Sequence, residues 1–170
     1  KLDAATMPHV LIRESNGTFT YKKQTWGDRL VGDEDTAKQP SFVGSKINDV
    51  FFRKKRLGFL SDENNILSEV GEYFNFFKTT VTQLLDSDPI DTSASHIKVS
   101  KLRHAVPHNS GMVLFSDQTQ FILGSDGAMT AKTVKIDQTT DFETNLRTKP
   151  IGVGKNIFFV TNKGDYHGVR

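Results

Sequence analysis

Met112-Val-Leu-Phe115 is an apolar run, and the polar segment Ser116-Asp-Gln-Thr119 follows it directly. A second run with apolar residues, Gln120-Phe-Ile-Leu123, comes next. Apolar runs of this length around turn-forming residues are typical of a β-hairpin. The polar segment begins with Ser116 and Asp117, whose short side chains can bond to their own backbone and so start a turn. This stretch therefore predicts two antiparallel strands joined by a tight turn.

The same pattern occurs three times along the chain. Two apolar residues, a hydroxyl residue and then Asp or Asn stand at 59–62, 114–117 and 159–162. The hydroxyl residues Ser61, Ser116 and Thr161 lie 55 and 45 residues apart, close to the period of four-stranded propeller blades. The sequence thus predicts an all-β fold of antiparallel four-stranded repeats that form part of a β-propeller. A β-sandwich with similar hairpins is the alternative.

Turn signals divide the chain into two parts. Asn16-Gly17 separates two β-rich runs and predicts a hairpin, because both residues tolerate a positive φ. The glycines, proline and charges of residues 27–41 indicate an exposed connector. We therefore expect residues 1–46 to be a hairpin and connector that joins neighbouring parts of a longer protein. Residues 47–170 are expected to form about two and a half propeller blades.

Three further segments carry specific expectations. Val81–Leu85 is predicted to form one helical turn, the one local helix of the chain. The alternating patterns of Ile97–Val106 and Met129–Ile136 predict strands. The chain starts at Lys1 and stops at Arg170 directly after a strand-like stretch, so we expect a piece of a longer polypeptide, with a processed or engineered start as the alternative.

Composition narrows the functional classes. The 170 residues contain no cysteine, which excludes disulfides, thiolate metal sites and cysteine nucleophiles within this stretch. The 22 basic and 20 acidic residues give a net charge of +2, too balanced for a dedicated nucleic-acid binder. No run approaches the ~18 apolar residues of a spanning helix, so we expect no stable membrane insertion.

Candidate sites for chemistry have simpler structural explanations. The acidic residues Asp86, Asp88 and Asp91 lack the glycine and closing glutamate of a calcium loop, which favours a turn. His104 and His108 flank Pro107, so they do not share a helix face as paired metal ligands would. Gly152–Lys155 lacks the first glycine and the hydroxyl of a phosphate loop. We therefore predict no enzyme, and assign no catalytic, cofactor-binding or metal residue and no cofactor.

Two clusters have one structural and one binding interpretation. Arg53–Arg56 is interpreted as an exposed hairpin tip, and contact with phosphate or an acidic partner is the alternative. The aromatic residues of Tyr73–Phe77 are interpreted as core or subunit interface, with a sugar or base platform as the alternative. His9, His96 and His167 are isolated and are expected at or near the surface.

Several short motifs follow one another in a recognisable order and spacing: Met7–Arg13, Gly17–Phe19, Trp26–Arg29, Gly32-Asp33, Pro40–Gly44, Ile47–Asp49, Arg56–Asn64, Tyr73–Phe76, Asp88–Asp91, Ala105–Pro107, Phe115–Phe121 and Pro150–Ile157. Together they resemble the tail nozzle (tail tubular B) proteins of short-tailed, autographivirus-type phages. The resemblance covers nearly the whole chain, and departures from it lie mostly in residues 33–39 and 78–87.

The resemblance implies a structural role in the phage tail of the virion. Members of that family are several times longer than this chain, contain a β-propeller, and form a hexameric tube below an adaptor ring. The tube carries the DNA exit channel, and tail fibres attach near the junction. For this chain the resemblance implies a homo-oligomer that forms a hexameric ring, with the tail adaptor protein and tail fibres as partners. Phage DNA would pass without sequence-specific binding, and no family catalytic residue is carried over.

Two other functions remain open from the sequence. One is a carbohydrate-binding or carbohydrate-cleaving propeller module that acts at the host surface, and the other is an isolated adhesion module. A partial propeller would expose apolar faces, here with Phe51, Phe52, Phe158 and Phe159. Such faces drive association, so we expect this piece to self-associate or to bind the rest of its own protein.

Overall fold

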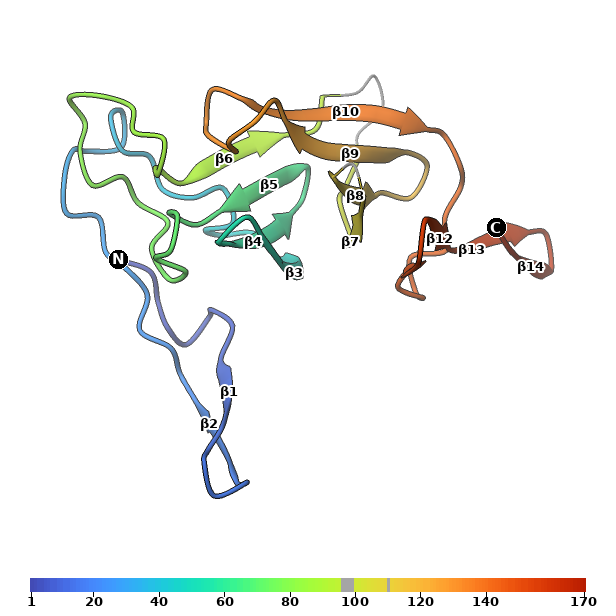
Figure 1. Cartoon of the computed structure of the whole chain (residues 1–170), viewed down its shortest axis with the longest axis horizontal. Coiled ribbons are helices and arrows are strands. Elements are labelled where there is room, and N and C mark those ends of the chain that lie inside the picture. Colours follow the sequence, from blue (N-terminus) through green and yellow to red (C-terminus); the bar gives the residue numbers. More distant parts are fainter. Residues whose placement is uncertain (96–99, 110) are drawn as a thin grey trace.

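The chain is built from β-strands. The structure, a computed structural model, describes residues 1–95, 100–109 and 111–170, and these contain fourteen strands and no helix (Figure 1). The all-β prediction is therefore confirmed. The helical turn expected at Val81–Leu85 is wrong, because this segment is a loop. The Thr80 hydroxyl accepts a hydrogen bond from the Thr82 amide at 3.3 Å, and side-chain bonds of this kind compete with helix formation.

Two four-stranded antiparallel sheets form the centre of the molecule. Sheet 1 consists of β3 (Ile47–Arg53), β4 (Arg56–Ser61), β5 (Asn64–Leu67) and β6 (Ile90–Ser93), paired in chain order. Sheet 2 consists of β7 (His104–His108), β8 (Gly111–Phe115), β9 (Gln120–Ser125) and β10 (Val134–Thr140), again in chain order. The predicted four-stranded antiparallel repeats are thus confirmed in two places.

Two predicted strands begin later than expected. The strand expected from Met129 starts only at Val134, because Thr130 and Thr133 bond to each other and to nearby backbone in a turn. His96 and the first part of the strand expected at Ile97–Val106 lie outside the described residues, and β7 begins at His104.

The third repeat, residues 151–170, forms two separate two-stranded pairings and not one four-stranded sheet. β11 (Ile151–Val153) pairs with β12 (Asn156–Phe158), and β13 (Val160–Lys163) pairs with β14 (Tyr166–Val169). Phe159 and Arg170 exchange two backbone hydrogen bonds of 3.0 and 2.9 Å. β12 and β13 are therefore almost one strand, flanked by β11 along its first half and by β14 along its second. The turn expected from Thr161 comes later, after Lys163.

The sequence motif marks equivalent positions in the three repeats. It begins three residues after the start of the second strand each time, at Phe59, Leu114 and Phe159. The hydroxyl residue that follows is buried in all three cases. The predicted turn bond is present at Ser116, whose Oγ donates to the Thr119 carbonyl at 2.8 Å. Thr161 instead donates to the Gly168 carbonyl, across the ladder, at 3.3 Å.

Sheet 1 is buried on both faces. One apolar cluster joins it to sheet 2 and contains Leu60, Leu67, Ile90, Leu114, Phe121 and Leu123. The other face of sheet 1 packs against the N-terminal segment, with the Phe59 ring between those of Phe42 and Phe76 at 5.4 and 5.1 Å. Because neighbours cover both faces, every residue of β4 is buried.

Residues expected to be exposed divide into two groups. Phe51 is buried between the sheets, where its ring lies over Gly58 and occupies the space that a side chain there would need. Phe159 packs against Phe115 of sheet 2, with ring centroids 5.4 Å apart. The expectation is therefore wrong for these two residues, while Phe52 and Phe158 are exposed by 57% and 41%. The three repeats thus stack in chain order, each against the next.

A carboxylate connects the first strands of the three repeats. Asp49 of β3 accepts a 2.8 Å hydrogen bond from the Ala105 amide of β7. It also pairs with Lys149, just before β11, at Nζ–O distances of 2.7 and 2.6 Å. β7 contacts both β3 and β11, so the first strands adjoin one another in series.

A buried arginine connects the outer parts of sheets 1 and 2. Arg56, the first residue of β4, is completely buried. Its guanidinium donates to five backbone carbonyls, those of Ser68, Asp86, Ser87, Asp88 and Met129, at 2.6 to 3.3 Å. Burial lowers the pKa of Arg56, and the charges of Asp88 and Glu69 oppose this shift. An arginine in a protein stays protonated, so this buried charge requires all of these acceptors.

Replacing Arg56 tests this connection. Arg56→Met leaves several buried carbonyls without a donor, and we expect it to lower the free energy of unfolding by about 3 kcal/mol. Arg147→Met is the matched control, because Arg147 is exposed, and it should cost less than about 0.5 kcal/mol. Urea denaturation followed by Trp26 fluorescence measures both. Equal losses in the two variants would contradict the role given to Arg56.

The Asp49 connection predicts an order of effects. Asp49→Ala removes the acceptor of the Ala105 amide as well as the ion pair, and should cost about 1–3 kcal/mol. Lys149→Met removes only the ion pair. Since the Lys149 side chain is 50% exposed, solvent screening limits that loss to about 1 kcal/mol or less. Thermal unfolding gives the comparison, and a larger loss for Lys149→Met than for Asp49→Ala would contradict this arrangement.

Candidate assembly surfaces

A hairpin projects from the body of the molecule (Figure 1). It consists of β1 (Val10–Arg13) and β2 (Phe19–Lys22), which confirms the hairpin predicted around Asn16-Gly17. Of Asn16 and Gly17, only Gly17 has a positive φ, of 85°. The Glu14 amide donates to the Thr18 carbonyl and the Gly17 amide to the Glu14 carbonyl, at 2.9 and 3.0 Å. The turn therefore has three residues and ends on a left-handed glycine.

One face of this hairpin is apolar and uncovered. The strand register places Leu11 opposite Tyr21, and Arg13 opposite Phe19. Leu11, Phe19 and Tyr21 are exposed by 65%, 62% and 70%; we call these three residues the hairpin patch. His9 stacks on Tyr21, with ring centroids 5.3 Å apart. A two-stranded ribbon is marginally stable by itself, so an apolar face on it points to a binding partner.

The third repeat presents a second apolar surface. Ile151 lies opposite Phe158, and Val169 lies opposite Val160. Strand alternation puts these side chains on the face away from Phe159, the residue that packs on sheet 2. Ile151, Val153, Phe158 and Val169 are exposed by 60%, 57%, 41% and 77%, and we call them the C-terminal patch.

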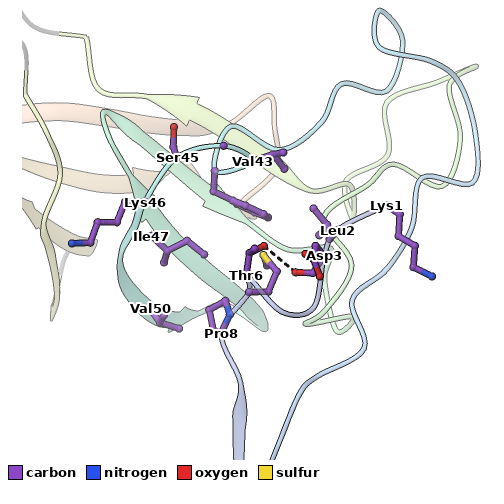
Figure 2. A pocket seen from close by; sticks show the side chains of 13 residues that line it. Lys1, Leu2, Asp3, Thr6, Pro8, Val43, Ser45, Lys46, Ile47 and Val50 are labelled. Carbon is purple, nitrogen blue, oxygen red and sulfur yellow. Dashed lines mark hydrogen bonds between the residues drawn. The ribbon is translucent and has the colours of Figure 1, made fainter.

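The N-terminal turn, the loop at residues 42–46 and β3 enclose a recess of about 690 Å³ (Figure 2). Its apolar side chains include Leu2, Val43, Ile47 and Val50. Figure 2 shows Lys1 and Lys46 at opposite sides, directed away from the other lining residues. The Thr6 hydroxyl donates to the Asp3 carbonyl at 3.0 Å. This lining suits an apolar group of a partner better than acid–base chemistry.

The acidic residues considered as calcium ligands have separate roles. Asp88 is buried and accepts the Leu85 amide at 2.9 Å, whereas Asp91 accepts the Ser41 amide at 2.8 Å. Asp86 is exposed. The turn interpretation therefore fits the structure. Across the described ranges there is no group of three or more His, Asp or Glu side chains arranged to hold a metal ion, and no helix long and apolar enough to cross a bilayer.

The two histidines and the glycine-rich segment have backbone partners. His104 and His108 both lie on β7, and their Nε2 atoms are 2.9 and 3.4 Å from the carbonyls of Leu146 and Lys155. Gly152 lies against the Pro107 carbonyl, which a Cβ atom would approach to 3.3 Å. Gly152 thus lies in β11 where two backbones approach closely, and Gly154 and Lys155 form the β11–β12 turn.

The basic cluster Arg53–Arg56 does not form one exposed tip. Lys54 and Lys55 occupy the β3–β4 turn with positive φ of 45° and 60°. Arg53 donates to the Gly111 carbonyl at 3.0 Å, Lys54 donates to the Gly127 carbonyl at 2.7 Å, and Arg56 is buried. The charges of these four residues gave no sign that Arg56 would be buried. The apolar run that follows Arg56 was a usable signal, because it marks β4 as a central strand.

The aromatic cluster is mostly core. Phe76 and Phe77 are buried, as the structural interpretation expected, and they lie in a loop. Tyr73 remains partly exposed and packs edge-on against Phe52, with ring centroids 4.7 Å apart. The exposed hairpin face is a candidate binding surface that sequence reasoning missed, because alternation with polar residues looks the same on a half-buried strand.

Comparison with known proteins places these surfaces in context. The profile of the bacteriophage nozzle protein family matches residues 1–170. The chain is 43% identical over 165 residues to tail tubular protein gp12 of Escherichia phage T7, and this match covers 97% of the chain. It spans only 21%, about one fifth, of the length of that relative. The chain therefore belongs to the bacteriophage nozzle protein family and is a structural component of the phage tail.

Proposed function

We propose that this chain forms part of the wall of the conduit through which DNA leaves the phage particle. The observation that carries the proposal is the stack of three sheet repeats, with an apolar surface still uncovered on the last of them. Family membership supports a tail location for such a stack. A section of wall needs rigid, repeating sheets and edges that bind further protein, and it needs no catalytic centre.

The stack supports a β-propeller as the architecture of this wall section. Each complete repeat is a four-stranded meander, and the first strands β3, β7 and β11 adjoin in series, as neighbouring blades of a propeller do. On this proposal residues 47–170 are consecutive blades, and residues 1–46 are the hairpin and connector to neighbouring parts. The next sheet of the same polypeptide would cover the C-terminal patch.

The charge distribution suits passage of DNA without retention. The net charge is +2, and three of the four cations in the densest basic cluster, Arg53, Lys54 and Arg56, donate to backbone carbonyls. Phosphate binding grows with the number of free cations on a surface, so a near-neutral wall would hold DNA weakly and without sequence preference. The resemblance to nozzle proteins extends the proposal to a hexamer that contacts the tail adaptor protein and the tail fibres.

The carbohydrate-cleaving alternative gains no support from the acidic residues. Asp88 is buried beneath a turn, and Asp91 is bound to the backbone of the connector. We therefore infer a structural protein and not an enzyme. The host-surface adhesion alternative would place this chain at the outside of the particle.

Electron cryomicroscopy of intact particles tests the conduit. We expect several copies of this chain to surround a channel wide enough for duplex DNA, below the ring that closes the head. The physical reason is that a stack of sheets with apolar ends is stable only when other sheets cover those ends. Density for the chain on a fibre or spike at the periphery would contradict the proposal.

The C-terminal patch provides a second test. In the full-length protein, Phe158→Asp combined with Val169→Asp would bury charge beneath the next sheet, and we expect a loss of about 3 kcal/mol or more in stability. Lys155→Asp, at the exposed β11–β12 turn, is the control and should change little. Differential scanning calorimetry provides the measurement. An unchanged melting temperature in the double variant would mean that no sheet covers this surface.

A further inference from the structure

The projecting hairpin carries a net positive charge. Between His9 and Lys23 there are three basic residues, Arg13, Lys22 and Lys23, against the single acidic residue Glu14. This excess equals the net charge of the whole chain, +2, so the other residues are balanced overall. The same segment carries the hairpin patch of Leu11, Phe19 and Tyr21. It therefore presents an apolar face bordered by positive charge.

A second surface has the opposite charge. Residues 28–38 and 69–88 together contain eight acidic residues, of which Asp88 is buried, and three basic residues. The two segments lie side by side, since Asp35 and Lys78 line the same recess and Val81 lies next to Gly32. They form the loops at the left of Figure 1. We call this surface the acidic edge.

The acidic edge is also apolar in places. Leu30, Val81 and Leu84 are exposed by 85%, 44% and 38%. Hydrogen bonds from the Thr36 backbone and side chain, and from the Asp35 amide, hold the pKa of Asp33 below its ordinary value. Asp35 lies in the same turn and is exposed. Apolar side chains bordered by negative charge are thus the complement of the hairpin.

We propose that the β1–β2 hairpin of one copy docks on the acidic edge of a second copy of this chain. The inference rests on the proposed function, in which copies assemble around the conduit. The two surfaces differ from each other, so each copy offers its hairpin to one neighbour and its edge to the other. Contacts of this head-to-tail kind generate rings when the rotation closes. Opposite charges on the two surfaces would set orientation and association rate.

A second copy explains the hairpin better than nucleic acid does. DNA would account for the basic residues and could stack on Phe19 and Tyr21. It would leave the exposed Leu11 and the matching apolar residues of the acidic edge without an explanation. Docking between copies covers both apolar surfaces and pairs both charged borders in one contact.

Charge exchange in the full-length protein tests the docking. Lys22→Glu with Lys23→Glu should weaken self-association at least about tenfold, and Asp35→Lys with Asp86→Lys should do the same. These acidic residues were chosen because their exposed side chains leave the Asp33 turn intact. Combining all four changes should restore most of the association, since opposite charges again face each other.

The matched control is Lys101→Glu with Lys132→Glu, at two exposed positions outside both surfaces. Sedimentation velocity over a dilution series gives the association constants.

Disulfide trapping tests which surfaces meet. In a cysteine-free background, Tyr21→Cys and Leu30→Cys are made in two differently tagged full-length chains that are expressed together. We expect a disulfide between the two tags on mild oxidation, whereas pairs carrying the same single cysteine should stay uncrosslinked. If only chains with the same cysteine crosslink, or none do, the proposed contact is wrong.

The outcomes separate this inference from the function on which it rests. If the unaltered protein is monomeric at every concentration and in particles, assembly itself fails. If it assembles and neither pair of charge reversals weakens it, docking of hairpin on edge is wrong and assembly stands. If the hairpin variants change only retention of DNA on a filter, the partner is nucleic acid and the inference is overturned.

Discussion

The buried guanidinium of Arg56 constrains much of the structure, because several separate segments must place hydrogen-bond acceptors around it. This group lies at the start of the central strand β4 with no access to solvent. A charge taken out of water is tolerated only when nearby groups bind it by hydrogen bonds. Carbonyls from the Ser68 corner, from the loop before β6 and from the turn before β10 supply these bonds. The loop at residues 68–88 therefore folds back over sheet 1, and sheet 2 is held at a fixed position beside it.

With that arrangement fixed, the repeats can stack. Sheet 1 uses one face against sheet 2 and the other against the N-terminal aromatic cluster. Sheet 2 in turn packs against Phe159 of the third repeat. Asp49 makes the corresponding connection at the first strands. Most of the polar side chains considered as candidates for chemistry form hydrogen bonds with backbone groups, and this is consistent with a structural tail component.

The surfaces left over are those that concern assembly. The hairpin patch and the C-terminal patch lie near opposite ends of the sequence. The C-terminal patch is the uncovered face of the third repeat, at the end of the stack. The chain spans about one fifth of the length of its relative in phage T7, and on the proposed function these surfaces meet further parts of the protein or further copies of it. Charge distinguishes the hairpin from the acidic edge: residues 9–23 carry a net charge of +2, and the acidic edge is the surface on which we propose that the hairpin docks.

The sequence by itself determined the local structure. Its apolar runs, the Asn16-Gly17 turn and the repeated apolar-hydroxyl motif were enough to predict hairpins, four-stranded repeats and the absence of long helices, because strand alternation and turn chemistry act between neighbours in the chain. Family membership could also be recognised from short motifs.

The tertiary structure decided which side chains are buried and what they contact. Arg56 and Lys55 are adjacent and equally charged, yet one is buried and the other exposed. Phe51 is covered and Phe52 is not, because side chains alternate between the two faces of a strand and only one face of β3 meets sheet 2. Burial depends on which distant segment packs against a residue, and no local pattern encodes that.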